Sequence, residues 1–192
     1  ATSVSEIVEF RSMAVVGDER ALTQIKGVDD IYPLVGEMVL DPAMSLDTAL
    51  ADHSGNPGAV MERALSDRLG IAAGDTFKLG SKAYHLSALI VREPDSAASG
   101  FALGPRTLLR RDALEGSGLL GPGTLFNSKY RLTLPQGTDL DGLKTAALEQ
   151  FENSGMRWTD ARNGAPGVAR FVERLGAFLV LVGLSGLAVG GV

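Results

Sequence analysis

Residues 59–91 read AVMERALSDRLGIAAGDTFKLGSKAYHLSALIV, and this stretch carries the clearest structural signals in the chain. Apolar residues recur every four positions from Met61 to Leu69, which predicts a helix with one face on a core. Gly70 lies just beyond that helix, at the position where a helix stop favours a left-handed backbone, and Ile71 follows it. This pair predicts a Schellman stop, in which the apolar residue folds back against the helix.

The same stretch continues into a hairpin. Thr76–Leu79 and Tyr84–Val91 have the composition of strands, and Gly80–Lys82 between them has that of a turn. A helix followed by two adjacent strands does not fit the strict alternation of a doubly wound sheet. We therefore expect an α+β fold of mixed strands and helices, arranged as one core domain with the option of two lobes.

Flanking segments add further elements to this core. The Val- and Ile-rich run 4–16, the turn 17–19 and the run 21–28 predict a hairpin. A short helix with Ser45 as its N-cap is expected over 45–51, and a longer one opened by Thr138, with an apolar stripe up to Phe151. Strands are also expected over 35–40, 106–109, 130–134 and 156–159, helical turns over 29–32 and 112–115, and a loop over 52–58.

The C-terminal stretch differs sharply from the rest of the chain. All 18 Lys and Arg and all 23 Asp and Glu residues lie at or before Arg174. The remaining residues, LGAFLVLVGLSGLAVGGV, average about +2.2 in hydropathy, against a mean hydropathy of +0.12 for the whole chain. A run that is apolar on all sides and rich in glycine predicts the start of a membrane-spanning helix. A buried C-terminal core helix is the alternative.

Two parts are therefore expected. Residues 1–167 form the folded core domain, and residues 168–192 form a helix that enters the membrane. Asn163–Gly167, which reads NGAPG, is expected to act as a hinge between them.

The composition excludes several classes of protein. Hydrophobic residues make up 45% of the chain, which is enough for a core and excludes a disordered acidic tail. A net charge of −5 without a basic stripe argues against nucleic-acid binding. Because the chain has no cysteine, it has no disulfide, thiolate metal site or cysteine nucleophile.

A search for chemistry finds no catalytic constellation. The phosphate-loop and nucleophile-elbow patterns are absent from the sequence. The residues that could carry chemistry have structural interpretations: His53 as a solvated loop residue, His85 as a strand-face residue, Asp29–Asp30 and Glu93 with Asp95 as loop acids or caps, Trp158 as a core or lobe contact, and Arg110–Arg111 as an isolated basic pair. We predict no catalytic residue, no metal ligand and no cofactor-binding residue.

Six segments of the chain together resemble one family. They are VSEIVEFRSMAV (4–15), KGVDDIYPLVGE (26–37), ERALSDRLGIAAGDTFKLG (62–80), IVREPD (90–95), LGPRTLL (103–109) and RFVERLGAFLVLVGLSGLAVGGV (170–192). These segments look like the first periplasmic domain of an FtsX-like or MacB-type ABC transporter permease, in particular of its YbbP-like group.

The resemblance implies a function without catalysis. The domain would lie on the periplasmic side of the bacterial inner membrane, between the first and second transmembrane helices of a permease subunit. Its implied partners are a cytoplasmic ATP-binding subunit, a periplasmic partner protein and membrane lipid, but not nucleic acid. ATP-driven motion would reach the domain through the helix 168–174 and drive the export or extraction of a hydrophobic or lipid-type substrate, or activate the partner.

Two other functions remain open. One is a membrane-tethered periplasmic binding module without an ATPase, and the other is a membrane-anchored hydrolase. An ATP-binding subunit encoded beside the gene would distinguish the first from a permease, and turnover of ester substrates would identify the second.

Overall fold

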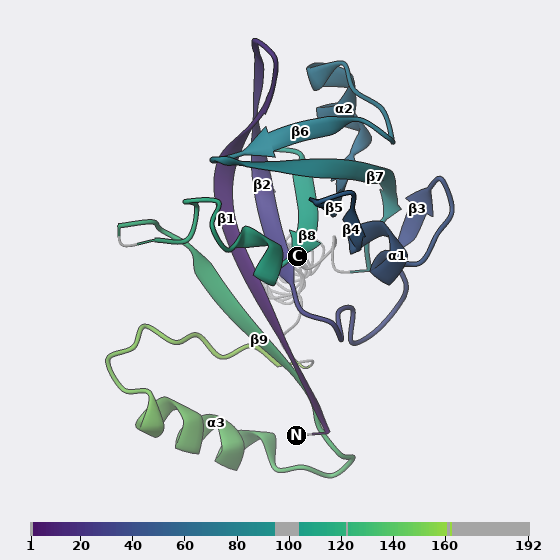
Figure 1. Cartoon of the computed structure of the whole chain (residues 1–192). Coiled ribbons are helices and arrows are strands. Elements are labelled where there is room, and N and C mark those ends of the chain that lie inside the picture. The colour runs from purple at the N-terminus through teal and green to yellow at the C-terminus, as the bar shows by residue number, and fades with distance from the viewer. Residues whose placement is uncertain (1, 95–103, 122, 161, 163–192) are drawn as a thin grey trace, which may run out of the picture. The chain divides into compact units, whose positions relative to one another are not determined.

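A computed structural model describes residues 2–94, 104–121, 123–160 and 162 of the chain. The chain divides into two compact units, Ala1–Gln136 and Gly137–Val192, which are described separately. Figure 1 labels their strands and helices. The predicted hinge over 163–167 and the predicted membrane-entry helix over 168–192 lie outside the described residues. Within the described residues, no helix is both long enough and apolar enough to span a membrane.

The first unit begins with a long hairpin of β1 (Ser3–Val16) and β2 (Glu19–Val28). The antiparallel register runs unbroken from Ile7 opposite Val28 to the last pair before the turn. Gly17 opens this two-residue turn with a φ of +56°. A positive φ at that position matches the right-handed twist of the flanking strands, which is why glycine is favoured there. The predicted hairpin is confirmed.

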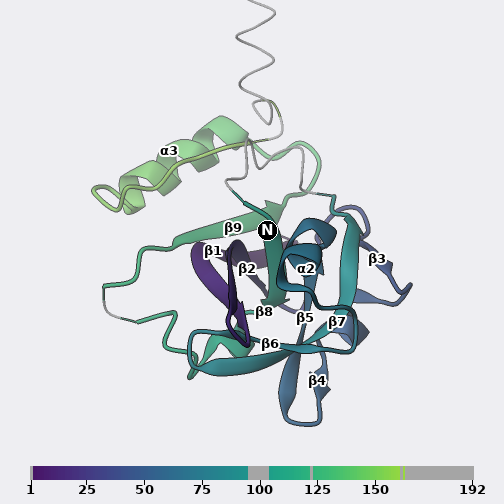
Figure 2. The same cartoon turned by 90° about the horizontal axis from the view of Figure 1, so that it is seen from above.

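Six of the described strands pair into a closed ring. From β1 the pairing passes to β6 (Thr76–Leu79), β7 (Lys82–Arg92), β5 (Asn56–Glu62), β8 (Arg106–Arg110) and β2, which returns to β1. The β2–β8 and β5–β7 pairs are parallel, and the other pairs in the ring are antiparallel. Figure 2 shows these strands from above. Such a mixed sheet with few helices confirms the α+β class.

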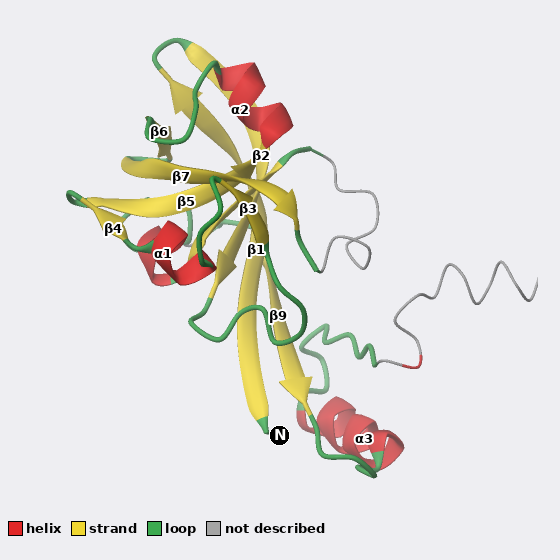
Figure 3. Ribbon diagram, turned by 90° about the vertical axis from the view of Figure 1, so that its right-hand side faces the viewer, coloured by secondary structure: helices red, strands yellow, loops and turns green. Residues whose placement is uncertain are grey.

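Three further strands extend this ring. β3 (Val39–Asp41) pairs with β7, β4 (Asp52–His53) pairs with β5, and β9 (Asn127–Thr133) pairs with β1. The β1–β9 pairing starts with Ser3 opposite Thr133, beyond the part of β1 that pairs with β2. In Figure 3, β1 and β9 therefore form a two-stranded ribbon that extends away from the other strands.

The helix at the centre of the quoted stretch ends as predicted but starts later. α2 spans Arg63–Leu69, because β5 continues through Glu62 and takes up the first residues of the periodic pattern. Gly70 has a φ of +66° and donates its N–H to the Asp67 carbonyl over 3.3 Å. The N–H of Ile71 reaches the Ser66 carbonyl over 3.1 Å. Both bonds of the Schellman motif are thus formed.

The predicted loop over 52–58 is wrong, because this segment forms β4 and the first half of β5. Ser54 and Gly55 both have positive φ values and make a tight turn. The turn sets Asp52 opposite Pro57, so the flanking backbone is extended and paired. Gly58 then lies against the end of α1 (Leu46–Leu50), with its N–H bonded to the Ala51 carbonyl over 2.9 Å.

Other elements match the predictions to different degrees. The short helix α1 has Ser45 as its N-cap, as expected, and its hydroxyl accepts the Thr48 N–H over 3.1 Å. The strand expected over 35–40 is only β3, residues 29–32 form a turn rather than helix, and residues 156–159 have no regular structure. The expected helical turn over 112–115 is present as the 3₁₀ turn Asp112–Leu114.

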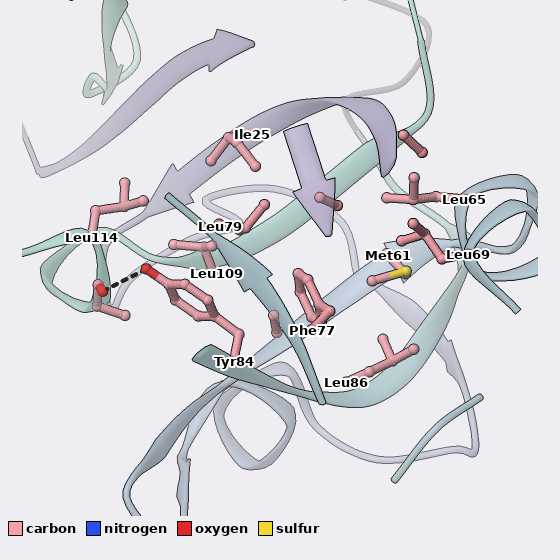
Figure 4. Packing of buried hydrophobic residues seen from close by; sticks show 14 of the residues in the cluster. Ile25, Met61, Leu65, Leu69, Phe77, Leu79, Tyr84, Leu86, Leu109 and Leu114 are labelled. Atoms are coloured by element: carbon pink, nitrogen blue, oxygen red, sulfur yellow. Dashed lines mark hydrogen bonds between the residues drawn. The ribbon is translucent and has the colours of Figure 1, made fainter. Parts of the chain in front are cut away.

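Two clusters of buried side chains pack on opposite faces of these strands. Adjacent residues of one strand go to different clusters, because strand side chains alternate between faces: Ile7, Val60 and Leu108 to the smaller cluster, and Val8, Met61 and Leu109 to the larger. Figure 4 shows the larger cluster, where Leu65 and Leu69 of α2 join Phe77. The Tyr84 hydroxyl lies buried there and donates to the Ala113 carbonyl over 2.9 Å.

The second unit contains α3 (Leu140–Gln150). Its N-cap is Asp139, one residue later than the predicted Thr138, because the Asp139 carboxylate accepts the N–H groups of Asp141 and Gly142, each over 3.1 Å. None of the α3 residues is buried within the described part of the chain. The expected apolar stripe is therefore not buried there.

Candidate functional site

The first predicted carboxylate pair has a structural role. Asp29 accepts the Ser5 hydroxyl over 2.9 Å and the Glu6 backbone N–H over 2.5 Å, so it caps the free edge of β1. Asp30 forms an ion pair with Arg110 over 2.9 Å. Both acids thus act as loop anchors, as the sequence indicated.

The interpretation of Glu93 as a solvated loop acid is wrong. Only 5% of this residue is exposed, and it lies directly after β7 among charged partners. Its carboxylate forms two ion pairs, one from Oε1 to Lys26 of β2 and one from Oε2 to Arg106 of β8, the latter over 2.5 Å. Its predicted companion, Asp95, lies outside the described residues.

The carboxylate of Glu93 is the centre of a buried ion network. Tyr32 donates its hydroxyl to Glu93 Oε1 over 2.9 Å and accepts from Lys26 Nζ over 2.8 Å. Lys26 Nζ also lies 4.5 Å from the centre of the Tyr32 ring. Arg106 uses its Nε to bind Glu62 of β5 over 3.0 Å. The network therefore contains two cations, two carboxylates and one phenol.

This network joins elements rather than presenting a reactive group. The side chains of Lys26 and Glu93 are each only 3% exposed, so leaving water is costly unless every charge is paired. The pairs satisfy this condition and connect β2, β5 and β8 to the end of β7. The Glu93–Arg106 pair also ties together the two ends of the segment between β7 and β8. We interpret the network as structural, because it holds these strands of the closed ring together.

The two histidines lie side by side, which the sequence did not indicate. His53 of β4 and His85 of β7 have ring centres 4.4 Å apart and planes 31° apart. Partial burial and the neighbouring His53 both lower the pKa of His85, whereas Asp75 opposes that shift. Across residues 2–94, 104–121, 123–160 and 162, no group of three or more His, Asp or Glu side chains could hold a metal ion.

The remaining singled-out residues also make local contacts. Trp158 donates its indole N–H to Asp160 over 3.2 Å within the second unit. Arg162 binds the same carboxylate, and this contact is the main reason that the pKa of Asp160 is lowered. Arg111 pairs with Glu6 over 3.2 Å. Trp158 and Arg111 are thus each held by a hydrogen bond or an ion pair to a nearby carboxylate.

A surface groove lies between the segment 30–38 and the start of α1. Its volume is about 360 Å³, and it is open to solvent. The lining combines apolar and acidic side chains, among them Ile31, Pro33, Glu37, Leu46 and Asp47. Its floor includes Tyr32, whose hydroxyl belongs to the buried network.

Comparison with curated proteins supports the predicted resemblance. No family model matches the chain. The chain is 26% identical over 181 residues to YbbP of Escherichia coli K12, an uncharacterized ABC transporter permease. That match covers 94% of this chain but 21% of YbbP. The chain thus spans about a fifth of the length of the curated relative.

Solved structures share the fold. The extracellular domain of the noncanonic ABC-type transporter YknZ from Gram-positive bacteria has a TM-score of 0.52 and 12% identity, over 81% of this chain and 77% of that one. The periplasmic region of MacB from Actinobacillus actinomycetemcomitans has a TM-score of 0.50 and 11% identity, over 78% and 65%. A domain of a putative permease from Porphyromonas gingivalis has a TM-score of 0.50 and 16% identity, over 78% and 69%. The predicted resemblance to MacB-type periplasmic domains is confirmed.

Proposed function

We propose that the chain is an extracytoplasmic domain of an ABC transporter permease subunit, on the periplasmic side of the bacterial inner membrane. The identity with YbbP over nearly the whole of this chain is the observation that carries the proposal. The shared fold with transporter domains supports it. In this proposal residues 1–167 form the periplasmic core and residues 168–192 enter the second transmembrane helix.

The domain has a mechanical role rather than a catalytic one. A cytoplasmic ATP-binding subunit supplies the energy, and the helix over 168–174 carries its motion to the core through the hinge at 163–167. The core then drives the export or extraction of a hydrophobic or lipid-type substrate, or acts on a periplasmic partner protein. No residue of this chain performs chemistry in this mechanism.

The architecture of the first unit suits this role. A closed ring of paired strands resists sliding of one strand past another, because each shift would break hydrogen bonds on both sides. The buried network adds ion pairs between Glu93, Arg106 and Glu62, which lie on different strands or at their ends. A force applied at one end of such a body moves the body as a whole.

Placement and partnership can be tested in cells. Because the chain has no cysteine, Asp18→Cys at the exposed β1–β2 turn introduces a single thiol in this domain. We expect a membrane-impermeant maleimide to label it in intact spheroplasts, and we expect the permease to copurify with an ATP-binding subunit. Labelling only after lysis contradicts the periplasmic placement. If the permease purifies without any ATP-binding subunit, a tethered binding module is favoured.

The coupling step needs the complete transporter. A crosslink between Asn163→Cys and Gly167→Cys should leave ATP hydrolysis intact but reduce ATP-dependent extraction of a fluorescent phospholipid from proteoliposomes. Reduction of the crosslink should restore extraction. Unchanged extraction in the crosslinked transporter contradicts the hinge, and steady ester hydrolysis by the isolated chain contradicts a purely mechanical role.

A further inference from the structure

The groove between residues 30–38 and the start of α1 has the features of a peptide-docking site. We propose that it binds an extended segment of a partner protein, in which a basic side chain is flanked by apolar ones. The inference rests on the proposed function only for placing that partner outside the cytoplasm. The groove geometry carries the rest.

The walls of the groove are held in place before any ligand arrives. Arg110 is the main fastener, because its guanidinium binds the Asp29 carbonyl over 2.8 Å, Asp30 over 2.9 Å and Asp47 over 2.5 Å. It thereby joins the loop wall to the helix wall. The hydroxyl of Tyr32 anchors the floor in the buried ion network. A prearranged groove binds more tightly, since less conformational entropy is lost on binding.

The charge of the groove favours a cation. Its described lining includes three carboxylates, Asp30, Glu37 and Asp47, but no Lys or Arg. Arg110 neutralises part of this charge from below, since its side chain is 17% exposed while those of Asp30 and Asp47 are 92% and 74% exposed. The outer sides of these carboxylates therefore still face solvent. The Glu37 carboxylate makes no hydrogen bond or ion pair within the described residues and is available to a ligand.

Apolar side chains accompany these acids. Ile31 in the lining is 48% exposed, and Val35 and Val39, which adjoin the lining residues Gly36 and Met38 in sequence, are 75% and 37% exposed. Exposed apolar residues that gather beside a groove mark interaction sites more often than scattered ones do. Acids and apolar residues on the same short segment complement a peptide in which basic and apolar residues are adjacent.

The openness of the groove distinguishes a peptide from a small molecule. Small-molecule sites enclose most of the ligand surface, whereas a volume of about 360 Å³ that opens to solvent leaves much of a compact ligand exposed. A chain that passes through the groove needs only two or three side chains to be covered. The geometry therefore favours a segment of a protein.

Defined peptides test this inference on the complete 192-residue chain in non-ionic detergent, with micelles alone as the blank. Fluorescent peptides of Gly and Ser carry Val-Lys-Val, Val-Glu-Val or Ser-Lys-Ser at the centre. Fluorescence anisotropy should show binding of the first, and roughly tenfold weaker binding of the other two, because one lacks the cation and the other the apolar flanks. Equal binding of all three overturns the proposal.

Variants then locate the binding. Glu37→Gln should weaken Val-Lys-Val binding by about two- to fivefold, with a smaller effect at high salt. Ile31→Ser, at the exposed apolar residue of the lining, should weaken it by about fivefold. Glu19→Gln and Leu22→Ser are matched controls on exposed positions near the β1–β2 turn and should leave binding unchanged. Unchanged binding in both groove variants, or self-association of the chain that the same variants abolish, overturns the peptide assignment. Neither result bears on the labelling and copurification tests of the proposed function.

Discussion

Removing one charge from the buried network should destabilise the first unit strongly. In Lys26→Met the cluster keeps Glu93 and Glu62 against Arg106 alone, and in Glu93→Leu it keeps two cations against one carboxylate. Breaking a buried ion pair from one side costs about 3–5 kcal/mol, because the remaining charge is left uncompensated. For a chain of this length the melting temperature should fall by on the order of 10 °C.

The double variant provides the decisive comparison. With both Lys26→Met and Glu93→Leu, Arg106 retains Glu62 over 3.0 Å, and the cluster is again balanced. The double variant still removes hydrogen bonds of the Tyr32 hydroxyl and of Arg106 Nη1, but it leaves no unbalanced charge, so the total cost should stay below the about 3–5 kcal/mol of a single variant. The two changes together should therefore cost less than either alone.

Urea unfolding followed by circular dichroism measures these free energies, with the chain in non-ionic detergent. The exposed pair Arg63–Asp41, whose side chains are 61% and 60% exposed, gives the matched control. Arg63→Met should cost no more than about 1 kcal/mol. Single network variants that cost as little as Arg63→Met, or a double variant equal to the sum of the singles, would refute the reasoning.

Three further predictions concern local features. A Cβ at Gly58 would lie 2.2 Å from a carbonyl oxygen of the last turn of α1. Gly58→Ala should therefore lower the unfolding free energy by more than about 2 kcal/mol in thermal melts. Gly121→Ala is the control and should change it little, because a Cβ there meets nothing within 4 Å. Because the pKa of His85 is lowered in the folded state, its contribution to stability is present above the ordinary histidine pKa and is lost as the pH falls below it. The His85→Asn variant should therefore lose less stability than the wild type between neutral and mildly acidic pH. An identical loss in unfolding titrations contradicts the lowering of the His85 pKa by burial and by His53. Asp29→Ala should cost about 1–2 kcal/mol by urea unfolding, because the capped N–H and hydroxyl of β1 lose their acceptor, and an unchanged midpoint contradicts the capping role.

Local signals in the sequence predicted local structure well. The first hairpin and the Schellman stop at Gly70 depend on neighbouring residues, so alternation and glycine placement were sufficient. The segment over 52–58 was different, because its glycine, proline and asparagine resembled a loop. It is extended because Asp52 and His53 pair with Pro57 and Asn56 across the Ser54–Gly55 turn. β5 then continues into its pairing with distant β7 and β8, which leaves no trace in local composition.

The buried network shows a similar limit. Glu93 opens the polar run EPDSAASG, which favours a solvated loop. The available signal was Lys26, an isolated charge between Ile25 and Gly27 in a strand that is otherwise largely buried. Such a charge requires a partner. The partner, Glu93, is far along the chain, and its contact with Lys26 forms only when the ring of strands closes. The groove was also not predicted, because its two walls meet only after folding.

The pairing of β1 with β9 has a consequence for how such a domain is carried by a longer chain. Ser3 lies opposite Thr133, and the N–H of Thr2 bonds to the Thr133 carbonyl over 2.8 Å. The entry and exit points of the first unit are therefore neighbours. Placing it within a host polypeptide requires no long connection, and the loop-closure entropy of the insertion is small. Adjacent ends of this kind suit domain insertion: the unit can be inserted between two secondary structure elements of another protein without separating those elements.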